Sequence, residues 1–337
     1  MKQKNDINAE KFAALMVEKI ESLSNDWSKP WFYKANSKRN FFPQNITGRH
    51  YSGGNAFMLL LLCEKYNYST PIFLTFKQAK DSGISILKGA SSFPIYYPLF
   101  YAYHKKTKKR ILLDEYKKLS DEEKTSFQLV AYNQYYNVFN LDQTNFSDIF
   151  PEKWDELFSR FVVSQNNQDT NLVFSNLHLE RMLANQNWVC PIHQKYGDKA
   201  YYSISNDSIV IPHLDQFKNS ESRYSTLLHE MSHSCGVKSR LNRKNFYDSS
   251  TQSYGREELV AELSEALTGL VLGVSSSIRE ENAAYLKSWC KSIKEEPKFI
   301  FSVLSESVKC MNYICSHLNL SVASDISLSE PLLASAS

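Results

Sequence analysis

The pentapeptide His229-Glu230-Met231-Ser232-His233 constrains this 337-residue chain more than any other feature of its sequence. It lies in a stretch with helical periodicity, which predicts a helix over residues 221–235. A spacing of four residues puts the two imidazoles on one helix face, about 6 Å apart along the axis. Their nitrogens can then converge on one zinc ion, with bonds of about 2.0–2.1 Å. We therefore expect His229 and His233 to bind a single Zn²⁺, with Glu230 placed to take a proton from water.

A zinc site needs a third protein ligand, and the residues after the motif exclude one common class of site. Metzincins place a glycine three residues after the second histidine and a third histidine three residues later. Gly236 matches the glycine, but Ser239 occupies the position of the third histidine. The third ligand is therefore expected farther along the chain.

A helix predicted over residues 256–272 supplies the candidates for this ligand. Glu258, Glu262 and Glu265 share one face of it, whereas Glu257 lies about a quarter-turn away. We expect Glu258 to be the third ligand and Glu262 to hold a ligating histidine in place. This arrangement resembles the ExxxD pattern of gluzincins, with glutamate in place of aspartate.

An open fourth position on the zinc would make the site hydrolytic, because the ion lowers the pKa of a water and polarises a carbonyl. Glu230 would act as general base and then as general acid, which makes it the expected catalytic residue. A predicted hairpin ending at Ile211-Pro212, just before the zinc helix, would offer an edge strand to an extended peptide. Two alternatives stay open. One is a closed structural site with four protein ligands, including His213, and the other is a scaffold that binds no metal.

The net charge of +3 hides an uneven distribution along the chain. Residues 1–110 contain 18 Lys and Arg against 7 Asp and Glu, a balance of +11, which leaves 21 against 29, or −8, for the rest. This asymmetry indicates that the first half meets a polyanion, unless lysines on solvated faces simply accumulated there.

Periodicity predicts an α+β fold organised in two parts. Residues 1–162 are expected to form an α+β domain, residues 163–174 a linker, residues 175–320 a mainly helical domain with a small β-hairpin, and residues 321–337 a flexible tail. The expected helices cover residues 8–23, 56–66, 76–82, 120–127, 176–186, 221–235, 256–272 and 283–315, the last broken near Pro297. The expected strands cover residues 93–103, 111–113, 129–141, 200–204 and 208–211.

Composition argues against a membrane-spanning or disulfide-bonded chain. The longest apolar run, residues 56–63, is far shorter than the roughly 20 residues of a bilayer span, and the N-terminal residues are polar where a signal peptide is apolar. The six cysteines show no CxxC spacing, as expected of reduced thiols in a cytosol. We expect a cytoplasmic protein with no membrane partner.

Segments along nearly the whole chain match the pattern of one family in the same order. In the first half they are Pro30-Trp31 and residues 51–60, 71–79, 87–89, 92–94 and 138–144. In the second half they are residues 207–212, 227–233, 240–241 and 256–262. With these segments the chain resembles the ArdC family of antirestriction proteins, which are associated with conjugative plasmids and related mobile elements. The resemblance implies an N-terminal domain that binds single-stranded DNA and a C-terminal zincin-like metallopeptidase domain.

The resemblance further implies which residues of the first half contact DNA. Non-sequence-specific binding to single strands combines a positive groove with rings on which bases stack. The expected charges are Lys34, Arg39, Arg49, Lys77, Lys88, Lys105, Lys106, Lys108, Lys109 and Arg110, and the expected rings are Trp31, Tyr33 and Tyr51. The expected partners are single-stranded DNA and a protein or peptide substrate. The alternative is an active zinc-dependent endopeptidase whose basic domain only localises it to nucleic acid.

Overall fold

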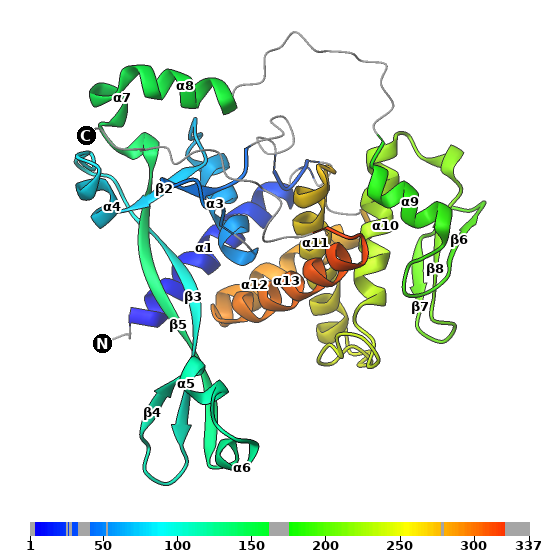
Figure 1. Ribbon diagram of the computed structural model, residues 1–337. Helices are drawn as coiled ribbons and strands as arrows, with labels where there is room; N and C mark the ends of the chain where they lie inside the picture. Colours follow the sequence, from blue (N-terminus) through cyan, green and yellow to red (C-terminus); the bar gives the residue numbers. More distant parts are fainter. Residues whose placement is uncertain are drawn as a thin grey trace.

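The computed structural model describes residues 4–24, 26, 29–32, 41–51, 53–161, 175–277 and 280–320, which form a mixed α+β fold (Figure 1). The predicted linker (163–174) and tail (321–337) lie outside these ranges. The helices are α1 (Lys4–Ser24), α3 (Gly53–Lys65), α4 (Phe76–Asp81), α5 (Leu113–Lys117), α6 (Asp121–Lys124), α7 (Phe146–Ile149), α8 (Pro151–Phe161), α9 (Leu177–Asn185), α10 (Ser220–Ser234), α11 (Thr251–Leu272), α12 (Leu286–Glu295) and α13 (Phe299–His317), with 3₁₀ helices η1 (Leu141–Gln143), η2 (Leu214–Gln216) and η3 (Glu280–Tyr285). The predicted α+β class is confirmed. None of the helices in the described ranges is long and apolar enough to cross a bilayer.

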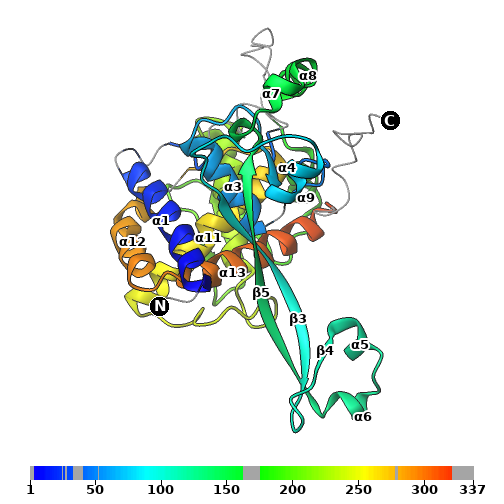
Figure 2. The same ribbon diagram turned by 90° about the vertical axis from the view of Figure 1, so that its left-hand side faces the viewer.

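Five strands form a sheet in the first half of the chain. They are β1 (Gln44–Asn45), β2 (Ile72–Thr75), β3 (Phe93–His104), β4 (Arg110–Leu112) and β5 (Phe127–Asn140), in the order β1-β2-β5-β3-β4. β1 and β2 run parallel, and every other pair is antiparallel. β3 and β5 pair along their whole length, from Phe93 opposite Val138 to His104 opposite Phe127. They extend away from the body as an arm, residues 97–134, whose distal end carries β4, α5 and α6 (Figure 2).

A second sheet of three strands lies before the helix that carries the histidine motif. Its strands are β6 (Ile192–Lys195), β7 (Tyr201–Ser203) and β8 (Ser208–Pro212), in the order β6-β8-β7. The predicted hairpin is confirmed as the antiparallel pair β7 and β8. The edge strand of this hairpin is β7, because β6 pairs in parallel with the other side of β8. β6 has one buried residue followed by three exposed ones and therefore gives no alternating pattern in the sequence.

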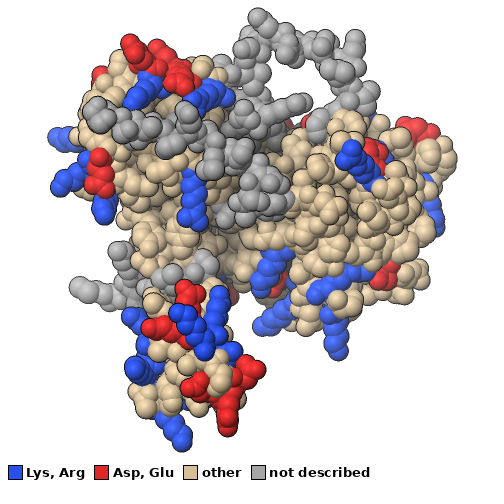
Figure 3. Space-filling view, in the orientation of Figure 1, with Lys and Arg blue, Asp and Glu red and all other residues tan. Residues whose placement is uncertain are grey.

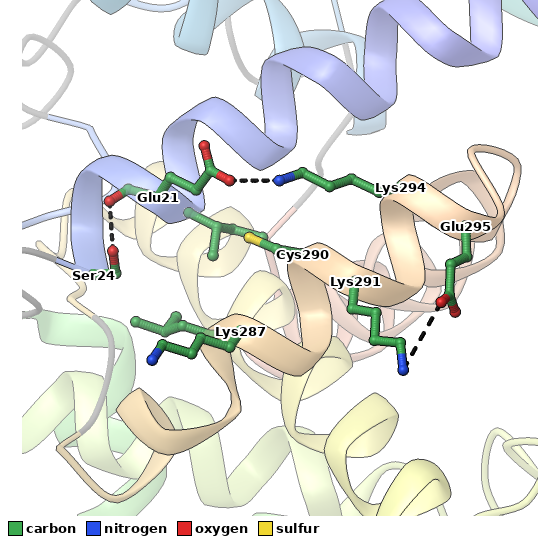
Figure 4. A pocket seen from close by; sticks show the side chains of 9 residues that line it. Glu21, Ser24, Lys287, Cys290, Lys291, Lys294 and Glu295 are labelled. Atoms are coloured by element: carbon green, nitrogen blue, oxygen red, sulfur yellow. Dashed lines mark hydrogen bonds and ion pairs between the residues drawn. The ribbon is translucent and has the colours of Figure 1, made fainter.

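One hydrophobic core runs through both predicted domains. The ring of Phe12 in α1 lies 5.0 Å from the ring of Phe93 in β3 and 5.0 Å from that of Phe301 in α13. At the start of α3, a Cβ on Gly53 would come within 3.0 Å of the Val308 side chain in α13, so glycine permits this close approach of the two helices. α1 also lies along α12, and Figure 4 shows the ion pair between them, Glu21 to Lys294 at 2.7 Å. The first helices of the chain therefore complete the core of its second half.

A second hydrophobic cluster fixes α10 against the small sheet. Leu227, Leu228 and Met231 are fully buried there together with Ile209 and Ile211 of β8. The apolar positions of α10 thus face the sheet and the helices behind it. The polar histidine motif is held on the same rigid helix, against α11.

Arg240 ties the loop after α10 to the turn between β7 and β8. Its guanidinium donates to both carboxylate oxygens of Asp207, at 2.8 and 2.7 Å, and to the Val189 carbonyl at 3.1 Å. It also donates to the carbonyl of Ser234 at 2.6 Å, at the end of α10. This arginine satisfies one orphan carbonyl at the end of α10 and fixes the position of the helix end that carries His233.

Candidate functional site

The histidine motif lies in the C-terminal half of α10. This helix begins where the Asn219 side chain accepts a hydrogen bond from the backbone of Ser222 at 2.8 Å, which satisfies one of its free N–H groups. His229 and His233 follow each other by one turn, with ring centroids 4.8 Å apart. Their Nε2 atoms are 3.0 Å apart, so both rings point to the same place, as the spacing predicts.

Glu258 of α11 completes a three-residue cluster. Its Oε2 lies 3.3 Å from Nε2 of His229, and its Oε1 lies 3.6 Å from Nε2 of His233. A tetrahedral ion with bonds of about 2.0–2.1 Å separates its ligand atoms by about 3.3 Å. The distances of 3.0 Å between the two Nε2 atoms and 3.3 Å from Nε2 of His229 to Oε2 are close to this separation, and Oε1 is the oxygen that approaches His233. The donor set of two imidazoles and a carboxylate suits zinc. Zinc binding by His229, His233 and Glu258 stays a prediction that this geometry supports.

The cluster is buried and strongly polarised. Burial alone lowers the pKa of His233, but the carboxylates of Glu258 and Glu257 outweigh burial and hold that pKa well above its ordinary value. Burial alone raises the pKa of Glu258, but the charge of His233 and hydrogen bonds from both histidines outweigh it and hold that pKa below its ordinary value. A metal binds only the deprotonated imidazole, so metal and proton compete for His233.

The carboxylate nearest to the outer nitrogen of His229 is Glu265 and not the predicted Glu262. Nδ1 of His229 lies 3.3 Å from Oε2 of Glu265 and 3.9 Å from Oε1 of Glu262. Ser225 of α10 donates a hydrogen bond to Glu265 and fixes it there. Glu262 instead accepts from Asn282, which also donates to Glu258, both at 2.9 Å. The structure thus places Glu262 beside Glu258 and Glu265 beside His229, the two predicted ligands.

A partner of His233 was not predicted from the sequence. Nδ1 of His233 lies 3.1 Å from Oε1 of Glu257, the residue expected to point a quarter-turn away. Arg243, buried in the loop after α10, donates to the same carboxylate and to the carbonyl of Ser232 at 2.9 Å. Glu257 and Arg243 therefore orient the second histidine, in the way that carboxylates orient metal-binding histidines in general.

Replacing Glu265 by glutamine is expected to weaken metal binding about 10- to 100-fold, because the neutral amide removes the negative charge that lies 3.3 Å from the outer nitrogen of the His229 ring. Glu262→Gln should have a smaller effect, since its oxygen is farther from that ring. Competition with a fluorescent zinc chelator measures both affinities. Glu295→Gln, at an exposed position of α12, is the control and should leave affinity unchanged. Equal losses for Glu262 and Glu265 would contradict the assignment.

Glu230 lies beside the first ligand and is 3% exposed. The side chain of His229 is 2% exposed and that of His233 is 15% exposed, so the cluster reaches solvent on the His233 side. Tyr254 lies in the first turn of α11, one turn before Glu258, and is 49% exposed. Burial raises the pKa of Tyr254, and the negative charges of Glu258 and Glu230 raise it further, so both carboxylates lie near its hydroxyl.

His213 does not join the cluster. Its Nδ1 lies 2.7 Å from Oδ1 of Asp215, and its ring stacks on Tyr196 with centroids 4.5 Å apart. These partners lie on the small sheet and the turn after it. The structure therefore gives no support to His213 as the fourth ligand of a closed site.

The predicted DNA contacts have three different outcomes. Tyr33, Lys34 and Arg39 lie outside the described residues. Trp31 and Tyr51 are only 0% and 7% exposed, because they pack beside Phe57 and Phe73 in the core, so the structure contradicts a stacking role for both. The remaining predicted residues are all exposed: Arg49, Lys77, Lys88, Lys105, Lys106, Lys108, Lys109 and Arg110.

The exposed charges do not gather in one groove. Lys77 lies in α4, at the end of β3 and β5 that joins the body, whereas residues 105–110 lie at the distal end of the arm (Figure 1). Basic and acidic side chains both appear at that distal end (Figure 3). A cavity of about 440 Å³ lies between α1 and α12 and is lined by none of the predicted DNA contacts (Figure 4).

Two family models match the chain, one in each half. Residues 6–139 match the N-terminal domain of the anti-restriction factor ArdC, and residues 178–306 match a zincin-like metallopeptidase. The second match contains the whole buried cluster of α10 and α11. The predicted linker, residues 163–174, lies in the gap between the two matches, and the domain boundary stays a prediction.

The chain is also similar to a curated protein and to solved structures. The DNA primase TraC of Escherichia coli is 28% identical over 309 residues, which cover 90% of this chain and 27% of TraC, so the chain spans about a quarter of that relative. Two crystal structures of the antirestriction protein ArdC from plasmid R388 share its fold. The metal-free structure has a TM-score of 0.63 at 23% identity, and the alignment covers 92% of this chain and 98% of the ArdC chain. The Mn(II)-bound one has a TM-score of 0.64 at 24% identity, with coverages of 92% and 97%.

Proposed function

We propose that this chain is an antirestriction protein with two functional domains. The proposal is supported by the matches of its two halves to the N-terminal domain of the anti-restriction factor ArdC and to a zincin-like metallopeptidase. Its front half binds single-stranded DNA without sequence specificity, and its rear half carries a zinc-dependent peptidase site. The observation that carries the second part is the convergence of His229, His233 and Glu258 on one point, beside the buried Glu230.

Zinc held by these three residues would polarise a peptide carbonyl and ease the loss of a proton from water. Glu230 accepts that proton and passes it to the leaving amine. The carboxylates of Glu265 and Glu257, with oxygens 3.3 and 3.1 Å from the opposite ring nitrogens, keep the two Nε2 atoms aimed at the centre. The R388 ArdC structure is described as Mn(II)-bound, which makes manganese the competing ion. Metal analysis of protein purified without added metal decides between them.

The single-stranded-DNA part rests on the ArdC-type domain and on the exposed basic residues at the distal end of the arm. Five of the six residues from Lys105 to Arg110 are Lys or Arg, and each is exposed. Lysines and arginines that contact phosphates release counterions, so such binding weakens as salt rises. A peptidase whose basic domain serves only to localise it remains the second candidate, because the cluster of His229, His233 and Glu258 is formed by α10 and α11 alone.

Replacing all five basic residues at the arm's end by glutamine is expected to weaken binding to single-stranded DNA at least tenfold at low salt. The slope of log affinity against log salt should fall by up to about 3.5, since each phosphate contact contributes about 0.7 for single strands. Fluorescence anisotropy with a labelled oligothymidylate measures both. The matched control replaces five exposed lysines of the second half: Lys218, Lys244, Lys287, Lys291 and Lys309. An unchanged slope in the arm variant, or the same loss in the control, would remove the arm from the proposed interface.

A further inference from the structure

Among the residues of the arm whose side chains the structure describes, four tyrosines share one face. In the antiparallel ladder, Ile95 lies opposite Tyr136, Tyr97 opposite Gln134, Tyr101 opposite Val130 and Tyr103 opposite Gln128. Residues directly opposite each other point to the same side of a sheet, and so do residues two apart along a strand. β4 adds Arg110 to this side, opposite Tyr103. We call this side, with Tyr97, Tyr101, Tyr103, Tyr136 and Arg110, the tyrosine face.

The tyrosine face is open to solvent along the part of the arm outside the body. Tyr97 is 39% exposed and Tyr136 is 41% exposed, with their rings 5.8 Å apart in an edge-to-face arrangement. Tyr101 and Tyr103 are half-buried. Aromatic rings on an extended two-stranded ribbon form an exposed apolar patch, and such patches mark sites where something binds.

Positive charge accompanies these rings. Residues 93–112 contain five Lys or Arg and no Asp or Glu, and β5 contains no charged residue. The guanidinium of Arg110 lies over the Tyr101 ring, 4.5 Å from its centroid. At the other end of the face, burial raises the pKa of Tyr97 and the nearby Arg49 opposes that rise, so a second arginine acts on these rings. The face therefore combines rings with cations at both of its ends.

The opposite side of the arm has a different character. Among the side chains that the structure describes on this side, the exposed large hydrophobic ones are Phe100 and Leu129, at 44% and 47%. At the distal end this side is covered by α5, whose Tyr116 packs on Phe127 with ring centroids 6.2 Å apart. α5 and α6 bring five acidic residues to this end: Asp114, Glu115, Asp121, Glu122 and Glu123. Acidic side chains repel a phosphate backbone, so they disfavour DNA beside α5 and α6.

We propose that the tyrosine face is where unpaired DNA bases stack, with the basic residues at the arm's end holding the phosphates. This inference rests on the proposed single-stranded-DNA function and names the surface that performs it. Tyr101 and Tyr103 are about 6.8 Å apart along the strand, twice the 3.4 Å rise between stacked bases. Bases stack on aromatic rings without regard to sequence, which fits non-specific binding. A duplex hides its base faces and does not fit this surface.

The test removes the rings and keeps the charges. In the triple variant Tyr97→Ala, Tyr101→Ala, Tyr136→Ala, affinity for a labelled oligothymidylate is expected to fall 100-fold or more, since one lost ring weakens binding about 5- to 150-fold. The corresponding triple Phe variant should stay within about threefold of the wild type, because it keeps the rings. The salt slope should be the same in all three proteins. A purely structural role of the rings would instead lower the slope, because the basic end would lose its place.

The opposite side of the arm supplies the matched control. The double variant Phe100→Ala, Leu129→Ala should bind as the wild type does, and an unlabelled duplex of equal length should compete poorly. The inference is overturned if the wild type binds and the triple Ala variant binds equally well, if the control loses as much affinity, or if the duplex competes equally. A wild type that binds no single-stranded DNA would overturn the proposed function itself.

Discussion

Cutting the chain within residues 163–174 is expected to leave its two pieces bound to each other. A protease recognition sequence inserted there allows the cut to be made in folded protein. After cleavage, the pieces should elute together from a sizing column at the position of the uncut chain, and should separate only in denaturant. The reason is the shared core, in which α1 and α3 of the first piece pack against α12 and α13 of the second.

The expected strength of this association follows from the buried side chains at the seam. Phe12, Met16 and Ile20 of α1 are each 0% exposed, as are Ile300 and Leu304 of α13. Fully burying one such side chain stabilises a structure by about 1.5–3 kcal/mol. Separating the pieces would expose many of them at once. Residues 1–162 produced alone should therefore aggregate or lack cooperative unfolding, contrary to the sequence-based expectation of an independent domain.

The ring of Phe12 lies at the centre of this shared core. Phe12→Ala removes a ring that touches both β3 and α13, and should cost about 3–5 kcal/mol, so the cut pieces should separate at a lower denaturant concentration. Ile7→Ala, at a 45% exposed position of the same helix, is the control. Pieces that separate in buffer and each unfold cooperatively would show two independent domains.

Local periodicity predicts the elements of this fold but not the partner that covers each one. The apolar stripe of Phe12, Met16 and Ile20 shows that one face of α1 is buried. It does not show that the covering helices come some 280 residues later in the chain. Trp31 and Tyr51 illustrate the same limit: aromatic rings among basic residues suit base stacking and suit a core equally well, and only tertiary packing decides.

In the candidate site, too, the spacing within one helix is predictable from the sequence and the packing between helices is not. Spacing within one helix brings His229 and His233 together, and a shared helix face selects Glu258. The outer partners depend on how α11 rotates against α10, which periodicity does not specify. That rotation brings Glu265 to His229 and Glu257 to His233. Glu265 lies on the same face of α11 as the predicted Glu262, about one turn later. Arg243 comes from a loop without periodicity, and no sequence signal pointed to it.

Glu230→Gln is expected to lower peptide hydrolysis about 10²- to 10⁴-fold while the protein keeps its metal. The amide cannot accept the proton of the attacking water, which removes general base catalysis. The metal ligands are untouched, so zinc content should equal that of the wild type. The arm lies on separate elements, so affinity for single-stranded DNA should also be unchanged. A mixture of quenched fluorescent peptides measures hydrolysis, and metal analysis and anisotropy measure the rest. Glu221→Gln, near the start of the same helix, is the control.

The same variant separates the two candidate functions when it is tested in cells. If protection of incoming unmodified plasmid from restriction falls with hydrolysis in Glu230→Gln, the peptidase acts in that protection. If protection persists in Glu230→Gln but is lost when His229→Ala removes the metal, the ion organises a binding surface and hydrolysis is dispensable. Hydrolysis that survives Glu230→Gln would show that another residue takes the proton. Absence of hydrolysis in the wild type, with zinc bound and the full peptide mixture tested, would remove the peptidase part of the proposal and leave the DNA-binding part to stand alone.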